Sequence, residues 1–195
     1  MPALHRRRWT IRDVKRLIDE RPAYTPRYEL VDGELLLTPA PSYRHQRLIG
    51  AVYRLLHEYV DRHHVGEAVV SPAEVRLTPD SYLEPDVFVV PAVNGRRPPA
   101  VDPTTRILLA VEVLSPSSAR HDRITKRRFF QRARLESYWI IDGEAELFEI
   151  WHPGDERPAL VDGPFIWNPT GATEPLLVDV ARFFAEAADT LPAEG

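Results

Sequence analysis

A single glutamate interrupts the most apolar stretch of this sequence. Residues 107–114 read Ile-Leu-Leu-Ala-Val-Glu-Val-Leu, and Glu112 is the one charged residue among them. A short apolar run of this kind is typical of a strand that is buried on both faces in the middle of a sheet. An ionised carboxylate in such a strand costs several kcal/mol unless its charge is compensated. A metal ion is the natural compensation, so the run predicts a central strand that carries a functional carboxylate.

The rest of the chain predicts a mixed sheet flanked by helices. Apolar residues at helical spacing predict helices over residues 10–20, 42–62, 117–134 and 178–187. Asp32-Gly33 suits a tight turn and predicts a hairpin. Strands are predicted over residues 28–31, 34–37, 66–77, 86–90, 107–114, 137–141 and 147–151, and the segment after Pro153 is expected to be rich in loops. This order indicates an α/β fold of the α+β kind, a mixed sheet flanked by helices.

Composition limits the classes of protein that fit. At 195 residues, with 44% hydrophobic and 28% charged residues, we expect one domain over residues 1–195, with a core of about 10–188 and a basic tail at 1–9. The absence of cysteine excludes a thiolate nucleophile and a Cys-based zinc site. No apolar run is long enough to span a membrane, so we expect a cytoplasmic protein without a membrane partner. The net charge of −4 argues against coating nucleic acid by bulk electrostatics, although local arginine clusters could meet phosphates.

A second carboxylate and a lysine accompany Glu112. Asp86 follows Pro85 at the start of a predicted strand. Two neighbouring strands would bring Asp86 and Glu112 to one end of the sheet, where carboxylate oxygens suit magnesium or manganese. Lys126 shares the apolar face of the next helix with Phe129 and Phe130, so it should point inward, where an ammonium can neutralise charge developing on a phosphate.

A structural role for these residues is the alternative. Asp122 and Lys126 are four residues apart in the favourable order for an ion pair on a helix surface, and Glu112 could pair with an arginine. Glutamate after a turn, as at Glu34, is also common in proteins without a site there. Ser115 and Ser117 lack a recognisable nucleophile motif, so serine catalysis is not expected.

Ordered motifs along the chain resemble the Uma2 family, formerly a domain of unknown function called DUF820. The motifs are residues 28–34 (Tyr-Glu-Leu-Val-Asp-Gly-Glu), 39–42 with 44–46, Pro85-Asp86, 111–117, Asp122 with Lys126, and 138–142. The resemblance covers about residues 10 to 188. The family in turn is similar to the PD-(D/E)xK superfamily, so the resemblance implies a restriction-endonuclease-like fold.

The resemblance also implies a site and a reaction. Glu34, Asp86 and Glu112 would bind Mg²⁺ or Mn²⁺, and Lys126 would assist the attacking water. Position 114, where the superfamily places its lysine, is leucine, so Lys126 would be a lysine that has migrated to the following helix. His45 and Asp122 would lie beside these residues or against the substrate.

Two hypotheses about function follow. The first is a Mg²⁺-dependent endonuclease that hydrolyses DNA phosphodiester bonds as a homodimer, because cutting two strands usually needs two sites. The second is a catalytically silent module that keeps the fold and binds nucleic acid or protein. The leucine at position 114 and the acidic net charge favour the second, whereas the joint presence of four polar residues at apolar locations favours the first.

Overall fold

The computed structural model describes residues 8–20, 26–97, 101 and 104–188. Residues 1–7 of the predicted basic tail therefore lie outside the described residues. Within the described part of the chain, no helix is both long and apolar enough to cross a membrane.

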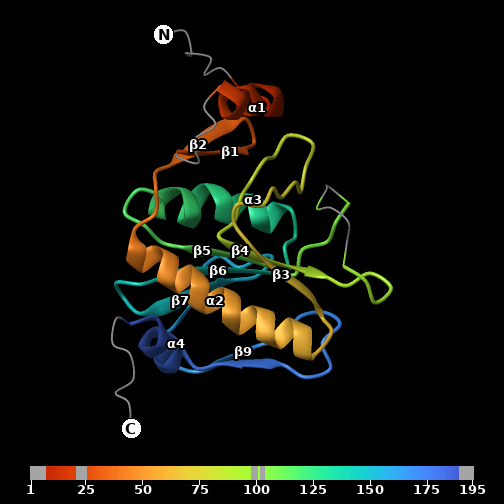
Figure 1. The fold of residues 1–195 in the computed structure, drawn as a ribbon, viewed down its shortest axis with the longest axis vertical. Helices are drawn as coiled ribbons and strands as arrows, with labels where there is room; N and C mark the ends of the chain where they lie inside the picture. The colour runs from red at the N-terminus through yellow and green to blue at the C-terminus, as the bar shows by residue number, and fades with distance from the viewer. Residues whose placement is uncertain (1–7, 21–25, 98–100, 102–103, 189–195) are drawn as a thin grey trace.

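A six-stranded mixed sheet forms the centre of the fold (Figure 1). Its strand order is β3-β4-β5-β6-β7-β8, in which β5 and β6 run parallel and all other neighbours run antiparallel. The strands are β3 (Gly66–Val70), β4 (Val87–Pro91), β5 (Leu109–Val113), β6 (Ser137–Asp142), β7 (Leu147–Trp151) and β8 (Ala159–Val161). All five residues of β5 are buried, so the prediction of a central strand around Glu112 is confirmed.

Helices cover both faces of this sheet, and each face has its own apolar core (Figure 1). Helix α2 (Tyr43–Arg62) and helix α4 (Val180–Ala187) pack on one face. The π-helical turn η1 (His121–Lys126) and helix α3 (Arg127–Arg132) lie on the other, where Phe129 and Phe130 are buried. Because strand residues alternate between faces, Val111 and Val113 join the α2 core while Ala110 joins the α3 core. Glu112 has the parity of Ala110 and therefore points to the α3 side.

A hairpin and the first helix form a separate layer at one end of the molecule (Figure 1). Strands β1 (Arg27–Val31) and β2 (Glu34–Thr38) pair antiparallel around Asp32 and Gly33, whose positive φ angles of 52° and 81° are those of the predicted tight turn. Helix α1 (Ile11–Glu20) packs on this hairpin through a small core. That core contains Val14, Tyr28, Leu30 and Tyr82. Backbone hydrogen bonds between Leu30 and Tyr82 join the hairpin to the segment that precedes β4.

Three sequence predictions were wrong in detail. The strand predicted over 66–77 ends at Val70, and the helix predicted over 117–134 begins later and includes the wide turn η1. The segment after Pro153 contains β8, β9 (Phe165–Trp167) and β10 (Leu176–Val178). These strands have three residues each, too few to show an alternation in the sequence.

Candidate active site

Asp86 and Glu112 face each other across adjacent strands. Val87 of β4 pairs with Val111 of β5, and extending this antiparallel register by one residue places Asp86 opposite Glu112. Residues opposed in this way share one face of the sheet with their Cβ atoms about 5 Å apart. Both side chains are 2% exposed. The prediction that neighbouring strands bring the two carboxylates to one end of the sheet is confirmed.

Lys126 lies at the centre of three carboxylates. Its Nζ atom donates a hydrogen bond to Glu112 Oε1 at 2.8 Å, lies 2.8 Å from Glu29 Oε2, and lies 3.5 Å from Asp122 Oδ1. Lys126 is only 2% exposed, so the alternative of a surface ion pair with Asp122 was wrong. The wide turn η1 turns Asp122 and Lys126 inward together, and such turns often occur at functional sites.

Glu29 on β1 completes the cluster from the hairpin. It is fully buried, and the backbone N–H of Glu84 donates to its Oε1 at 2.9 Å. Glu34, which the family pattern suggests as the early acid, is not part of the cluster. It lies at the first position of β2, beside the turn, and is exposed to solvent. Glu29, and not Glu34, is therefore the hairpin glutamate that lies beside Lys126.

Asp86 is held by a different set of groups. Arg27 donates to Asp86 Oδ1 from both Nη1 and Nη2 at 3.1 Å, and the backbone N–H of Val113 donates to Oδ2 at 2.9 Å. His45, in the first turn of α2, lies 3.6 Å from the same Oδ2. Its Nε2–H donates to the Val113 carbonyl at 2.8 Å, so the Nε2 atom carries a proton. His45 is therefore fixed beside Asp86, near the site as predicted.

The cluster holds more carboxyl groups than cations. Four buried carboxylates, those of Glu29, Asp86, Glu112 and Asp122, meet two cations, Arg27 and Lys126. Burial raises the pKa of Glu112 well above its usual range and also raises the pKa of Asp122. Burial alone would lower the pKa of Lys126, but Glu112 and Glu29 outweigh it and raise that pKa. The ammonium thus stays charged, whereas the raised pKa values favour the protonated form of the Glu112 and Asp122 carboxyl groups.

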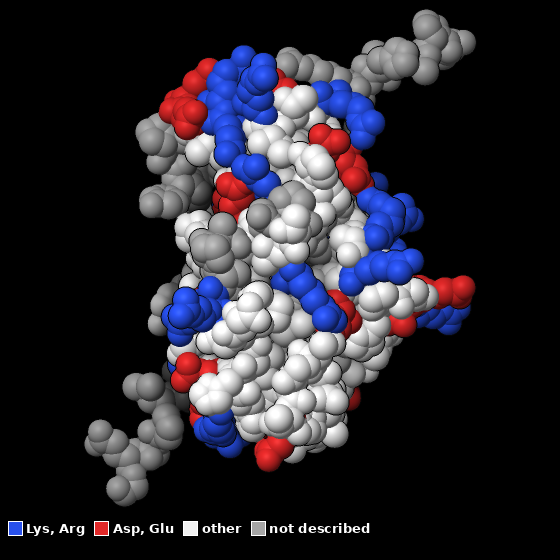
Figure 2. Space-filling view, turned by 90° about the vertical axis from the view of Figure 1, so that its right-hand side faces the viewer, with Lys and Arg blue, Asp and Glu red and all other residues white. Residues whose placement is uncertain are grey.

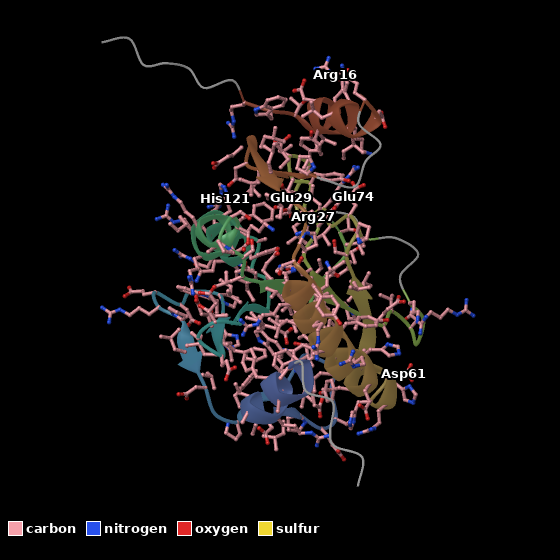
Figure 3. All side chains as sticks on the ribbon, turned by 60° about the vertical axis from the view of Figure 1, so that its left-hand side comes forward. Arg16, Arg27, Glu29, Asp61, Glu74 and His121 are labelled. Carbon is pink, nitrogen blue, oxygen red and sulfur yellow. The ribbon has the colours of Figure 1, made fainter. Side chains whose placement is uncertain are left out.

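A cleft of about 800 Å³ reaches this cluster. It lies between α1, the hairpin, the N-terminus of α2 and the loop at 115–117, and Arg27, His45 and Asp86 line it. Figure 3 shows that Arg27 and Glu29 lie between helix α1 and the central sheet. Glu29, Glu112 and Lys126 lie beyond the lining, so Asp86 is the carboxylate of the cluster nearest to the open space.

The donor set fits a divalent cation by its chemistry. Among the described residues, Glu29 Oε2 and both oxygens of Asp122 are buried without a hydrogen bond, although Lys126 lies near them. Carboxylate oxygens are the donors that suit Mg²⁺ or Mn²⁺, and a bound cation would favour the ionised form of Glu112 and Asp122. With Lys126 and Arg27 in their present positions, no group of three acids or histidines in the described chain has the geometry of a metal site.

Two comparisons with known proteins agree with this architecture. The sequence profile of the Uma2 family, described as "Putative restriction endonuclease", matches residues 16–175. A solved structure described as a putative nuclease belonging to DUF820, from Anabaena variabilis, superposes with a TM-score of 0.67 at 18% sequence identity, over 84% of this chain and 92% of the other. A search of curated proteins found no match. The family and the nuclease-like fold support a nuclease function, and the chain belongs to the Uma2 family.

Proposed function

We propose that this protein is an endonuclease that uses Mg²⁺ or Mn²⁺ to hydrolyse phosphodiester bonds in DNA. The observation that carries this proposal is the convergence of Glu29, Glu112 and Asp122 on the buried Lys126, with Asp86 opposite Glu112 at the cleft. The four acids and the lysine come from four segments of the chain, because Asp122 and Lys126 share the turn η1. Burying charged groups costs free energy, and titratable groups with perturbed pKa values beside a cleft are typical of functional sites.

Each residue has a role in this proposal. Asp86 and Glu112 would hold the cation, with Glu29 as the third acid in place of Glu34. When bound, the ion stabilises negative charge on the scissile phosphate as a Lewis acid. Lys126 would orient the attacking water through its Nζ protons. Asp122 lies beside the Lys126 ammonium on the same turn, η1. His45 contacts Asp86 and donates a hydrogen bond to the carbonyl of Val113.

The distribution of surface charge bears on how the protein would bind DNA. The face in Figure 2 shows Lys and Arg side chains in separate patches with acidic side chains between them, so it offers no continuous basic surface. Binding would therefore depend on local contacts with the backbone of the DNA. We further propose that the enzyme acts in the cytoplasm as a homodimer, because a cut through both strands needs two sites.

Cleavage of DNA tests the proposal directly. Supercoiled plasmid and single-stranded DNA are incubated with the purified protein in Mg²⁺, in Mn²⁺ and in EDTA. We expect cleavage with either metal and none in EDTA. An isosteric Glu112→Gln variant purified in the same way controls for a contaminating nuclease, because a contaminant would cut equally in both preparations.

A silent binding module is the second candidate, and one observation favours it. Lys126 and Arg27 already pair with the acids that would hold the metal. If these pairs are the final arrangement, Mg²⁺ and Mn²⁺ should leave the melting temperature unchanged, whereas a nuclease that binds the ion in its folded state should melt at a higher temperature as the metal concentration rises.

A further inference from the structure

Arg27 contacts Ser71 and Glu84 in addition to Asp86, and some of its N–H donors have no partner among the described residues. Its Nη1 atom donates to Ser71 Oγ at 2.9 Å, to the Glu84 carbonyl at 3.2 Å and to Asp86 at 3.1 Å, while Nη2 donates only to Asp86. A guanidinium carries five N–H donors. The Nε–H and one Nη2–H of Arg27 therefore have no hydrogen-bond partner among the described residues.

These spare donors lie on a side chain that borders the cleft. Arg27 is 20% exposed and lines the cleft beside Asp86 and His45. It is the one lysine or arginine among the described residues of that lining, where the charged neighbours include Asp19 and Glu84. A phosphodiester that approaches Asp86 is repelled by these carboxylates and attracted by Arg27. A guanidinium also matches the oxygens of a phosphate with two parallel hydrogen bonds.

We propose that Arg27 binds a phosphate of the substrate strand while it holds Asp86, so that one side chain positions the phosphodiester against the carboxylates. The ligand class is a phosphodiester anion of a nucleic-acid strand, and the inference rests on the proposed nuclease function. Ser71 and the Glu84 carbonyl fix the guanidinium plane, which leaves its free edge in a set orientation for the phosphate. Arg44 cannot take this role from its present position, because it lies outside the lining and donates to the carbonyl of Gly143.

The test is Arg27→Lys, which keeps the positive charge beside Asp86 but loses the planar fork. A lysine ammonium can pair with the Asp86 carboxylate or with the phosphate. It lacks the planar fork of donors that would let it contact Asp86, Ser71 and the phosphate at the same time. Binding of a short fluorescein-labelled DNA strand is measured by anisotropy in EDTA, so that no cleavage intervenes. We expect the Kd to rise about tenfold, the loss of one charge-assisted contact. In the cleavage assay with metal, KM should rise more than kcat falls.

Two controls separate a lost phosphate contact from a damaged fold. Arg106 makes a similar pair of contacts, with Glu136 and Thr170, away from the cleft, so Arg106→Lys should leave the Kd unchanged. A strand of the same sequence with a neutral methylphosphonate backbone should bind wild type and Arg27→Lys equally.

Three outcomes would overturn the role of Arg27. These are an unchanged Kd for the charged strand, an equal loss of affinity for the neutral strand, and no binding by wild type. If wild type binds the strand through Arg27 but cuts no DNA with any metal, the inference stands and the proposed nuclease function fails.

Discussion

Replacing Lys126 with methionine is expected to lower the free energy of unfolding by about 3–5 kcal/mol, which is the usual cost of removing one partner from a buried ion pair. The ammonium lies 2.8 Å from both Glu29 and Glu112, and all three side chains are buried. Without it the acids would face one another with no cation between them. Urea denaturation at neutral pH measures the change.

The chain offers a matched control, because it has only two lysines. Lys15 lies on α1 and is exposed, so Lys15→Met should change the free energy of unfolding by less than about 0.5 kcal/mol. A loss below about 1 kcal/mol in Lys126→Met would mean that the carboxylates are protonated or hydrated, and that the lysine does not hold the cluster together.

Glu112→Gln is expected to separate stability from activity. A glutamine still accepts the hydrogen bond from Lys126 but cannot ionise, so it removes the cost of holding a carboxylate charge in the buried cluster. We therefore expect the metal-free variant to be at least as stable as wild type. Its cleavage rate should fall by about 10²–10³, the range seen when one group that stabilises a transition state is removed. A less stable variant with full activity would contradict the assignment of Glu112.

The raised pKa of Glu112 predicts how the stabilities of wild type and Glu112→Gln differ with pH. Burial raises the pKa of Glu112 above its ordinary value near 4.5, so the folded protein keeps this proton at pH values where the unfolded chain has lost it. Wild type therefore loses the contribution of Glu112 to stability as pH rises from 4.5 through the folded pKa. The stability of Glu112→Gln relative to wild type should increase over this window and level off above it. Denaturation of both proteins between pH 4 and 8 in EDTA tests the sign.

The core of the site is predictable because charged residues stand at positions that the apolar pattern of the sequence predicts to be buried. Glu112 in its apolar run and Lys126 on the apolar face of its helix can both be placed from the amino-acid pattern alone. Glu29 gives the same signal, since it stands between Tyr28 and Leu30 in the first strand of the hairpin. A charged residue in an apolar strand thus marks Glu29 as well as Glu112, whereas Glu34 follows a turn, where glutamate is common.

Other features have no local signal. Arg27 becomes a partner of Asp86 only because the hairpin folds against the segment before β4, a contact between residues 59 positions apart. The π-helical turn η1 depends on packing: the hydroxyl of Tyr138 donates to the Asp122 carbonyl, and the N–H of Arg127 reaches back five residues to the same oxygen. Strands β8, β9 and β10 are held by their neighbours rather than by their own pattern.

Direct measurement of Mn²⁺ binding by titration calorimetry tests the central claim that this cluster is a divalent-cation site. The comparison uses wild type, Glu112→Gln and Glu149→Gln. Glu149 is a suitable control because it is also a buried strand glutamate with a cationic partner, Arg123, but lies outside the cluster. We expect saturable binding to wild type and Glu149→Gln, and strongly weakened binding to Glu112→Gln. Equal binding by all three proteins, or binding by none, would contradict it.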